Sequence, residues 1–299
     1  RGIALTGLGR YDEAVSDFNL AIERNPADPS IRYDRGRAYY LAGDDERAEA
    51  DYRASIQLEP ENEFPHAGLG NLRARQERYE EAIAFYDTAL AIEPAFEPVL
   101  ANIGGALSEL GRFADAISDF SAAIRINPDP QYFRYRADAY NALREFDRAI
   151  EDYTVAIEGG AGNEAAHYNR GRAFSLTDQF ESAIEDYTTA LAINPTLAAA
   201  LTNRGLAFSS LGDQRRAMEE YEAALRIEPN NPMAHGAMGN AWRFSGDCRK
   251  AIGSYSRVIE IAPDLAQAYQ FRAMCYRDLG MEAEAARDFA RAEELGYRE

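Results

Sequence analysis

An alanine recurs every 34 residues along this chain, and that spacing constrains the fold more than any other feature of the sequence. The one exception is a step of 33 residues between Ala116 and Ala149. The recurring residues are Ala14, Ala48, Ala82, Ala116, Ala149, Ala183, Ala217, Ala251 and Ala285. A fixed period of this size is typical of stacked small units that each bury an apolar face against their neighbours, and it argues against one globular core.

Three other positions recur at a fixed distance from the alanine. An aromatic residue lies four positions after it, as in Tyr52 and Tyr86, and a glycine or alanine lies twelve positions before it, as in Gly36 and Gly70. A proline closes seven of the units: Pro26, Pro60, Pro94, Pro128, Pro195, Pro229 and Pro263. Small and aromatic residues at fixed spacing predict core packing between helices, and proline marks where a helix cannot continue.

Together these residues resemble the tetratricopeptide repeat family along the whole chain. The resemblance implies an all-α fold, a right-handed superhelical solenoid of antiparallel helix pairs. When each repeat is numbered 1 to 34, glycine takes position 8, alanine position 20 and the aromatic residue position 24. We then expect one array over 1–299, with repeats at 1–28 (partial), 29–62, 63–96, 97–129, 130–163, 164–197, 198–231, 232–265 and 266–299.

Each repeat is expected to contain a helix A at positions 2 to 14, a tight turn, and a helix B that ends near position 30. The small residues at positions 8 and 20 should face each other where the two helices cross, with the position-24 ring packed against the next repeat. The fifth repeat ends in Gly159-Gly160-Ala161-Gly162 without proline, which makes 158–163 a possible flexible seam or a lengthened loop.

Composition excludes several functions. The formal net charge of −18 opposes nucleic acid and acidic membrane surfaces, which attract clustered cations, and no run of apolar residues is long enough to insert into a membrane. Metal-binding, phosphate-binding and nucleophile motifs are absent from the sequence, so we expect no cofactor, no metal and no enzyme. Cys248 and Cys275 are expected to be reduced thiols. The chain begins without Met and inside a helix, as an excised fragment would.

Arginine is strongly preferred over lysine, since Lys250 is the one lysine among 32 basic residues. This bias favours a GC-rich, bacterial genome, or a selection for planar bidentate pairing.

An arginine at position 7 always comes with an acid at position 23 of the same repeat. Six repeats carry both residues, whereas the repeats with Leu69, Ile103 or Met238 at position 7 carry the acid only once. Besides Arg1 with Asp17, the pairs are Arg35 with Asp51, Arg136 with Asp152, Arg170 with Asp186, Arg204 with Glu220, and Arg272 with Asp288. We expect contact within these pairs and a structural role, although inherited repeat sequence would leave the same trace.

In the family, helix A positions 2, 5, 6, 9, 12 and 13 line an inner groove. Here those positions hold six arginines against four acids, so the resemblance implies a groove far less acidic than the rest of the chain. The asparagines at positions 6 and 9 resemble, incompletely, the ladder by which some members hold a peptide backbone, because an amide both donates and accepts. The candidate groove residues are Arg134, Tyr135, Tyr168, Asn169, Arg172, Asn203, Asn102, Asn71, Asn240 and Arg243.

These features predict a non-enzymatic scaffold that binds a peptide segment or helix of another protein in its concave groove. The alternative is the substrate-docking arm of a larger enzyme, for example a glycosyltransferase, whose catalytic domain lies outside this chain. Self-association through the end repeats is a further possibility. No three consecutive repeats carry the residues of the family's chaperone-tail clamp, so that ligand is not expected.

Overall fold

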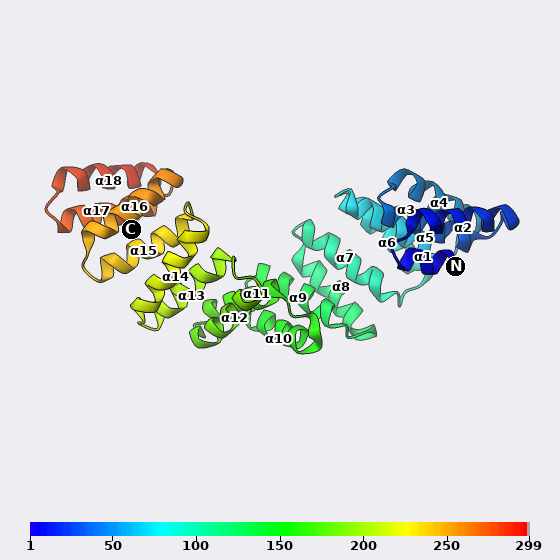
Figure 1. Ribbon diagram of the computed structural model, residues 1–299, viewed down its shortest axis with the longest axis horizontal. Helices are drawn as coiled ribbons and strands as arrows, with labels where there is room; N and C mark the ends of the chain where they lie inside the picture. The colour runs from blue at the N-terminus through cyan, green and yellow to red at the C-terminus, as the bar shows by residue number, and fades with distance from the viewer. Residues whose placement is uncertain (298–299) are drawn as a thin grey trace. The chain divides into compact units, whose positions relative to one another are not determined.

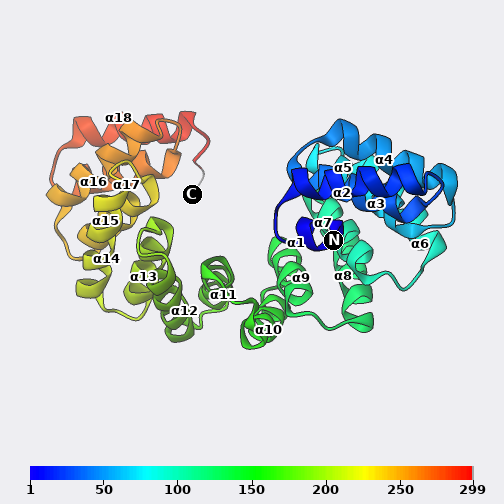
Figure 2. The ribbon, with the colours of Figure 1, turned by 45° about the vertical axis from the view of Figure 1, so that its right-hand side comes forward.

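The computed structural model describes residues 1–297, which contain eighteen α-helices, one π-helical turn and no strand. The chain divides into two compact halves, an N-terminal half (Arg1–Glu145) and a C-terminal half that starts at Phe146, and each half is described on its own. Within each half, every helix packs against the next one in the sequence (Figure 1 and Figure 2). The all-α class with packed helix pairs is therefore confirmed. No helix among the described residues is both long and apolar enough to cross a membrane.

The helices are short and of nearly constant length, as the repeat predicts. The N-terminal half contains α1 (Gly2–Gly7), α2 (Tyr11–Arg24), α3 (Pro29–Ala42), α4 (Asp45–Leu58), α5 (Glu63–Arg75), α6 (Tyr79–Ile92), α7 (Glu97–Glu109), α8 (Phe113–Ile126) and α9 (Pro130–Ala142). The C-terminal half contains α10 (Phe146–Ala156), η1 (Ile157–Ala161), α11 (Glu164–Leu176), α12 (Phe180–Ile193), α13 (Ala198–Ser210), α14 (Gln214–Ile227), α15 (Pro232–Phe244), α16 (Cys248–Ile261), α17 (Ala266–Asp278) and α18 (Glu282–Glu294).

The turn between the two helices of a pair has the same backbone conformation in every repeat. The residue at repeat position 15 has positive φ, for example +84° at Gly43 and +83° at Gly212, and glycine adopts that conformation without a steric penalty. Glu77, Arg144 and Asp178 adopt the same left-handed conformation with a side chain present. Glu77 therefore terminates its helix at a cost of about 1–2 kcal/mol that a glycine would not incur.

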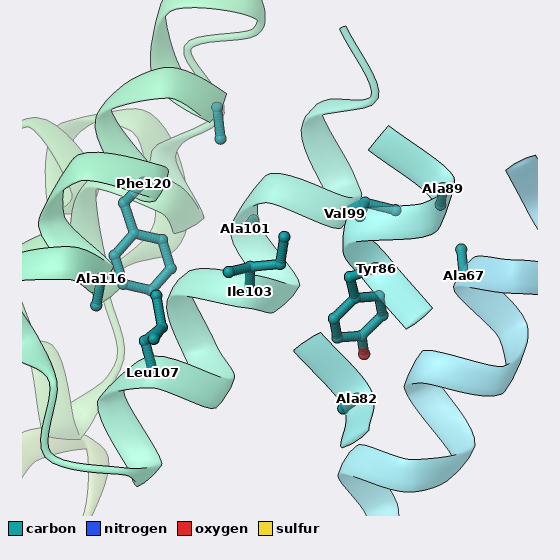
Figure 3. Close-up of a cluster of buried hydrophobic side chains, with 11 residues drawn as sticks. Ala67, Ala82, Tyr86, Ala89, Val99, Ala101, Ile103, Leu107, Ala116 and Phe120 are labelled. Atoms are coloured by element: carbon teal, nitrogen blue, oxygen red, sulfur yellow. The ribbon is translucent and has the colours of Figure 1, made fainter. Parts of the chain in front are cut away.

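In the repeats with glycine at position 8, the core forms where the aromatic ring of the same helix pair covers that glycine. A Cβ placed on Gly104 would lie 2.7 Å from Phe120 Cε1, closer than side chains tolerate. Figure 3 shows Ile103 of α7 between the rings of Tyr86 and Phe120, which come from α6 and α8. The expectation that positions 8 and 20 face each other was incomplete, because the position-24 ring fills the space above the glycine and also contacts the next helix.

The glycine-rich segment of the fifth repeat is locally irregular. After Ala156, helix α10 gives way to the π-helical turn η1, in which Gly160 has φ +90°. The division between the two halves falls at another place, between Glu145 and Phe146. The seam at 158–163 and the repeat boundaries remain predictions.

Candidate functional site

Five of the six predicted arginine–acid pairs lie within one half, and the structure brings the two partners of each into contact. The pairs are Arg1–Asp17 (3.3 Å), Arg35–Asp51 (2.7 Å), Arg170–Asp186 (2.7 Å), Arg204–Glu220 (2.8 Å) and Arg272–Asp288 (2.6 Å). In three of them, Nε and Nη2 of the arginine donate to the two carboxylate oxygens, the bidentate geometry that arginine favours. Arg136 and Asp152 belong to different halves, and their contact remains a prediction.

Every position-7 arginine except Arg1 has a second partner that the sequence analysis missed. In each of these five arginines, Nη1 donates to a side chain on helix B of the preceding repeat, at position 25. The observed acceptors are Asn19 (2.6 Å) for Arg35, Ser121 (2.9 Å) for Arg136, Thr154 (3.0 Å) for Arg170, Thr188 (3.0 Å) for Arg204 and Ser256 (2.9 Å) for Arg272.

A signal for this second contact was present in the sequence. Position 25 is Asn, Ser or Thr wherever the next repeat has arginine at position 7, and it is Arg53, Asp87 or Glu222 wherever the next repeat lacks it. The arginine thus ties one helix B to both helices of the following repeat, which fixes how the repeats stack. The partners of the arginine are side chains of this protein, so these residues support the groove rather than line it.

The inner face of the N-terminal half contains a cavity of ≈ 350 Å³ on helices α3, α5, α6, α7 and α9. Its lining includes Asn71, Arg75, Tyr86, Asn102 and Tyr135. Asn71 Oδ1 accepts two hydrogen bonds, from the Tyr86 hydroxyl (2.8 Å) and from Asn102 Nδ2 (3.0 Å). Burial raises the pKa of Tyr86, so its hydroxyl stays protonated and is able to donate. Two asparagines of neighbouring repeats therefore form one connected amide network at the surface of the cavity.

Two arginines of this inner face are paired with acids of their own half. Arg75 pairs with Asp45, donates to the Tyr40 carbonyl (2.7 Å) and lies over the Tyr40 ring. Arg134 contacts Asp138 (3.5 Å) one helical turn away and lies 4.5 Å from the centroid of the Tyr135 ring. Arg134, which the sequence predicts to be a groove donor, is thus already engaged in an ion pair.

In the C-terminal half, Asn240 repeats the contact that Asn71 makes. The Tyr255 hydroxyl donates to Asn240 Oδ1 (2.8 Å), because repeat positions 9 and 24 are the same two in both cases. Burial raises the pKa of Tyr255 to about 12, which keeps the hydroxyl neutral. Asn203 on α13 donates to the Tyr168 hydroxyl of α11 (3.1 Å), and Asn169 lies beside Tyr168 in sequence on that helix.

Two cavities adjoin on the inner face of this half. The first, ≈ 210 Å³, is lined mainly by apolar residues of α15, α16 and α17, together with Asn240. The second, ≈ 270 Å³, contains Arg172 and Asn203, and Leu206 of α13 lines both. Arg243 lies 5.2 Å from the centroid of Phe271, a wall of the first cavity. Within residues 1–297, no carboxylate pairs with Arg172 or Arg243.

Comparison with known proteins agrees with this architecture. Models described as "Tetratricopeptide repeat" match residues 1–63, 73–139, 164–197 and 198–231. No curated protein matches the chain.

Among solved structures, three illustrate the likeness. YrrB, described as a TPR protein with an unusual peptide-binding site, has 20% identity and a TM-score of 0.58, over 61% of this chain and 95% of its own. The APC/C hetero-tetramer Cut9–Hcn1 has 15% identity and a TM-score of 0.58, over 89% of this chain and 52% of its own. A tetratricopeptide repeat protein from Parabacteroides merdae has 17% identity and a TM-score of 0.56, over 83% of this chain and 98% of its own. These likenesses concern the fold, and with the matched repeats they lead to one conclusion: the chain belongs to the tetratricopeptide repeat family.

Proposed function

We propose that this protein is a non-enzymatic scaffold whose helix A surfaces hold an extended peptide segment of a partner protein. Its family and fold support a role in protein–protein interaction. The amide network of Asn71, Tyr86 and Asn102 carries the finer proposal. YrrB, which shares the fold, is described as having a peptide-binding site, and that description agrees with the proposal.

The network prepares the two asparagines for a peptide backbone. Both lone pairs of Asn71 Oδ1 are used, so its N–H donors are left for a ligand, and Asn102 keeps its Oδ1 as an acceptor. Turning both amides over would exchange these roles and still leave one donor face and one acceptor face. A peptide group carries one N–H and one C=O, so the pair is complementary to any peptide, whatever its side chains.

The C-terminal half offers a second set of amides for the same purpose. Asn203 and Asn240 line the two adjoining cavities, and each is oriented by a tyrosine hydroxyl. Asn169, one repeat before Asn203, is the remaining member of the predicted ladder. We expect these residues to bind the backbone, while neighbouring side chains select the sequence of the ligand.

A random peptide library displayed on phage provides the test, because it requires no knowledge of the natural partner. The best selected peptide, labelled with a fluorophore, is titrated with the protein by fluorescence anisotropy. Replacing Asn102 by Ala, or Asn169 and Asn203 together by Ala, should weaken binding by about tenfold, near 1.4 kcal/mol, without changing the circular dichroism spectrum. Gln57→Ala, which removes an exposed amide from helix B, is the control and should leave the affinity unchanged.

Unchanged affinity in both asparagine variants would contradict the proposal. The docking-arm alternative shares the same binding surface, and it differs only in the fate of the bound protein, which an attached enzyme would modify. Activity of the longer gene product on a bound partner would favour that alternative.

A further inference from the structure

An apolar hollow lies on the inner face of the C-terminal half. We call it the socket and define it by Leu206, Met233, Gly236, Ala237, Val258 and Phe271. Met233 and Leu206 are exposed at its rim (48% and 38%), although large apolar side chains gain free energy when they leave water. A Cβ on Gly236 would meet one atom, Val258 Cγ2, at 3.9 Å, so the floor of the socket is open.

The positive charge of the inner groove belongs to the same half. There the groove positions hold Arg172, Arg243 and Arg277 against Asp278, a net charge of +2. In the N-terminal half the same positions hold as many acids as arginines, and Arg75 and Arg134 are in ion pairs. In a chain whose formal net charge is −18, the socket is therefore bordered by a local excess of cations.

Arg243 is held at the edge of the socket without an acid of its own. Its Nε is buried and has no hydrogen-bond partner, and its guanidinium lies over the rings of Phe244 (4.9 Å) and Phe271 (5.2 Å). Phe244 itself is 75% exposed. Arg172 lines the adjoining cavity, on the far side of Leu206. A guanidinium fixed on aromatic rings beside an apolar hollow is well placed to bind a carboxylate, since such hydrogen bonds are about twice as strong as neutral ones.

We propose that the socket and its two arginines bind an acidic peptide segment, with a bulky aliphatic or aromatic side chain in the socket and a carboxylate on either side. This inference rests on the peptide-scaffold function proposed above and names the chemistry of its ligand. Asn240 faces the socket from the same helix as Gly236 and Arg243, so the backbone of the segment has an amide beside the anchor. The apolar anchor supplies affinity, and the acids supply orientation and sequence preference.

Substitutions at two glycines test the socket without disturbing the fold. Gly236→Leu fills the socket from an open helical position, and Gly253→Leu places the same side chain on α16 at an exposed position with no atom within 4 Å. A peptide from the random library, synthesised with a fluorophore, is titrated with the parent, with both variants, and with Met233→Ala, which removes a wall of the socket without filling it. We expect Gly236→Leu to weaken binding by at least about tenfold, Met233→Ala to weaken it less, and Gly253→Leu to leave it unchanged.

Charge reversal tests the arginines. Arg243→Glu and Arg172→Glu should each weaken the acidic peptide at least about tenfold and reduce the salt dependence of binding, and a peptide with Lys in place of its acids should recover affinity for these variants. Selected peptides without an apolar residue or without acids would overturn the inference, as would equal affinity of Gly236→Leu and the parent.

The outcomes also separate this inference from the scaffold function. A selected peptide that loses affinity in Asn102→Ala, yet binds Gly236→Leu and Arg243→Glu as the parent does, overturns the socket and leaves the scaffold function in place. A library that yields no binder argues against both. Self-association that Gly236→Leu abolishes, in the absence of any selected peptide, assigns the socket to a second copy of the chain and overturns the acidic peptide.

Discussion

Two glycines three residues apart in α15 should respond in opposite directions to the same substitution. A Cβ on Gly239 would lie 2.6 Å from Tyr255 Cε1 and 2.9 Å from Cδ1, whereas a Cβ on Gly236 would have 3.9 Å to its nearest neighbour. The Tyr255 ring is only 1% exposed, so it has little room to move aside. Replacing each glycine by alanine therefore tests whether the ring, rather than the helix, requires glycine at repeat position 8.

The expected magnitudes follow from two opposing effects. Alanine in a helix interior is favoured over glycine by about 1 kcal/mol, and both positions lie inside α15. At Gly236 this gain is unopposed, so Gly236→Ala should raise the free energy of unfolding by about 1 kcal/mol. At Gly239 the overpacked ring costs about 1–3 kcal/mol, so the net effect should lie between zero and a loss of about 2 kcal/mol. Because the helix gain cancels in the comparison, the two variants should differ by about 1–3 kcal/mol.

Urea denaturation followed by far-ultraviolet circular dichroism measures this difference. Gly253→Ala, an exposed glycine in the interior of α16 with an open Cβ position, is the matched control and should behave like Gly236→Ala. Identical denaturation midpoints for Gly236→Ala and Gly239→Ala would refute the account of the helix crossing given above. So would a Gly239→Ala protein more stable than the parent.

Three other experiments test the framework. In a double-mutant cycle, Arg170→Met should destabilise the protein by about 3–5 kcal/mol, because it leaves Asp186 buried without its arginine. Adding Asp186→Leu should recover part of this loss. A coupling energy near zero in urea denaturation would contradict the pairing. Glu77→Gly should raise the free energy of unfolding by about 1 kcal/mol, because glycine adopts the left-handed turn without strain, and a higher midpoint of thermal unfolding would show it. The hydrogen bond from Arg73 lowers the pKa of Glu49 from 4.5 to about 2. The Glu49 carboxylate therefore stabilises the fold fully above its ordinary pKa, and this stabilisation disappears as the pH falls toward 2. Glu49→Gln should flatten the acid-unfolding curve in that interval, and an unchanged curve would contradict this account.

Much of the fold was predictable because the repeat encodes it locally and many times over. Proline, glycine and the position-24 ring recur at fixed spacing, so helix type and the packing of pairs follow from the pattern. The arginine–acid contacts were predictable for a related reason. Arginine at position 7 and an acid at position 23, as in Arg35 and Asp51, occur together from repeat to repeat. The nine repeats of one chain can therefore be compared with each other in the way that related sequences are.

The candidate site was only partly predictable. The sequence selected Asn71 and Asn102 as separate rungs of a ladder, but not their hydrogen bond to each other. It treated Arg134 and Arg172 as equivalent groove cations, although only Arg134 contacts an acid of the groove. The difference depends on which side chains approach from the same and neighbouring helices, and residue type at a repeat position does not specify that distance.

The sequence by itself determined the class of structure, the helix pairs and the arginine network, because each arises from contacts at fixed separations along the chain. Only the tertiary structure decided where the groove is apolar and where its charge is unpaired. The socket consists of residues from α13, α15, α16 and α17 that are unremarkable singly, such as Gly236, whose open Cβ position exists only because no neighbouring helix fills it. Repeats that are alike in sequence thus differ in surface, since a surface is made by several repeats at once.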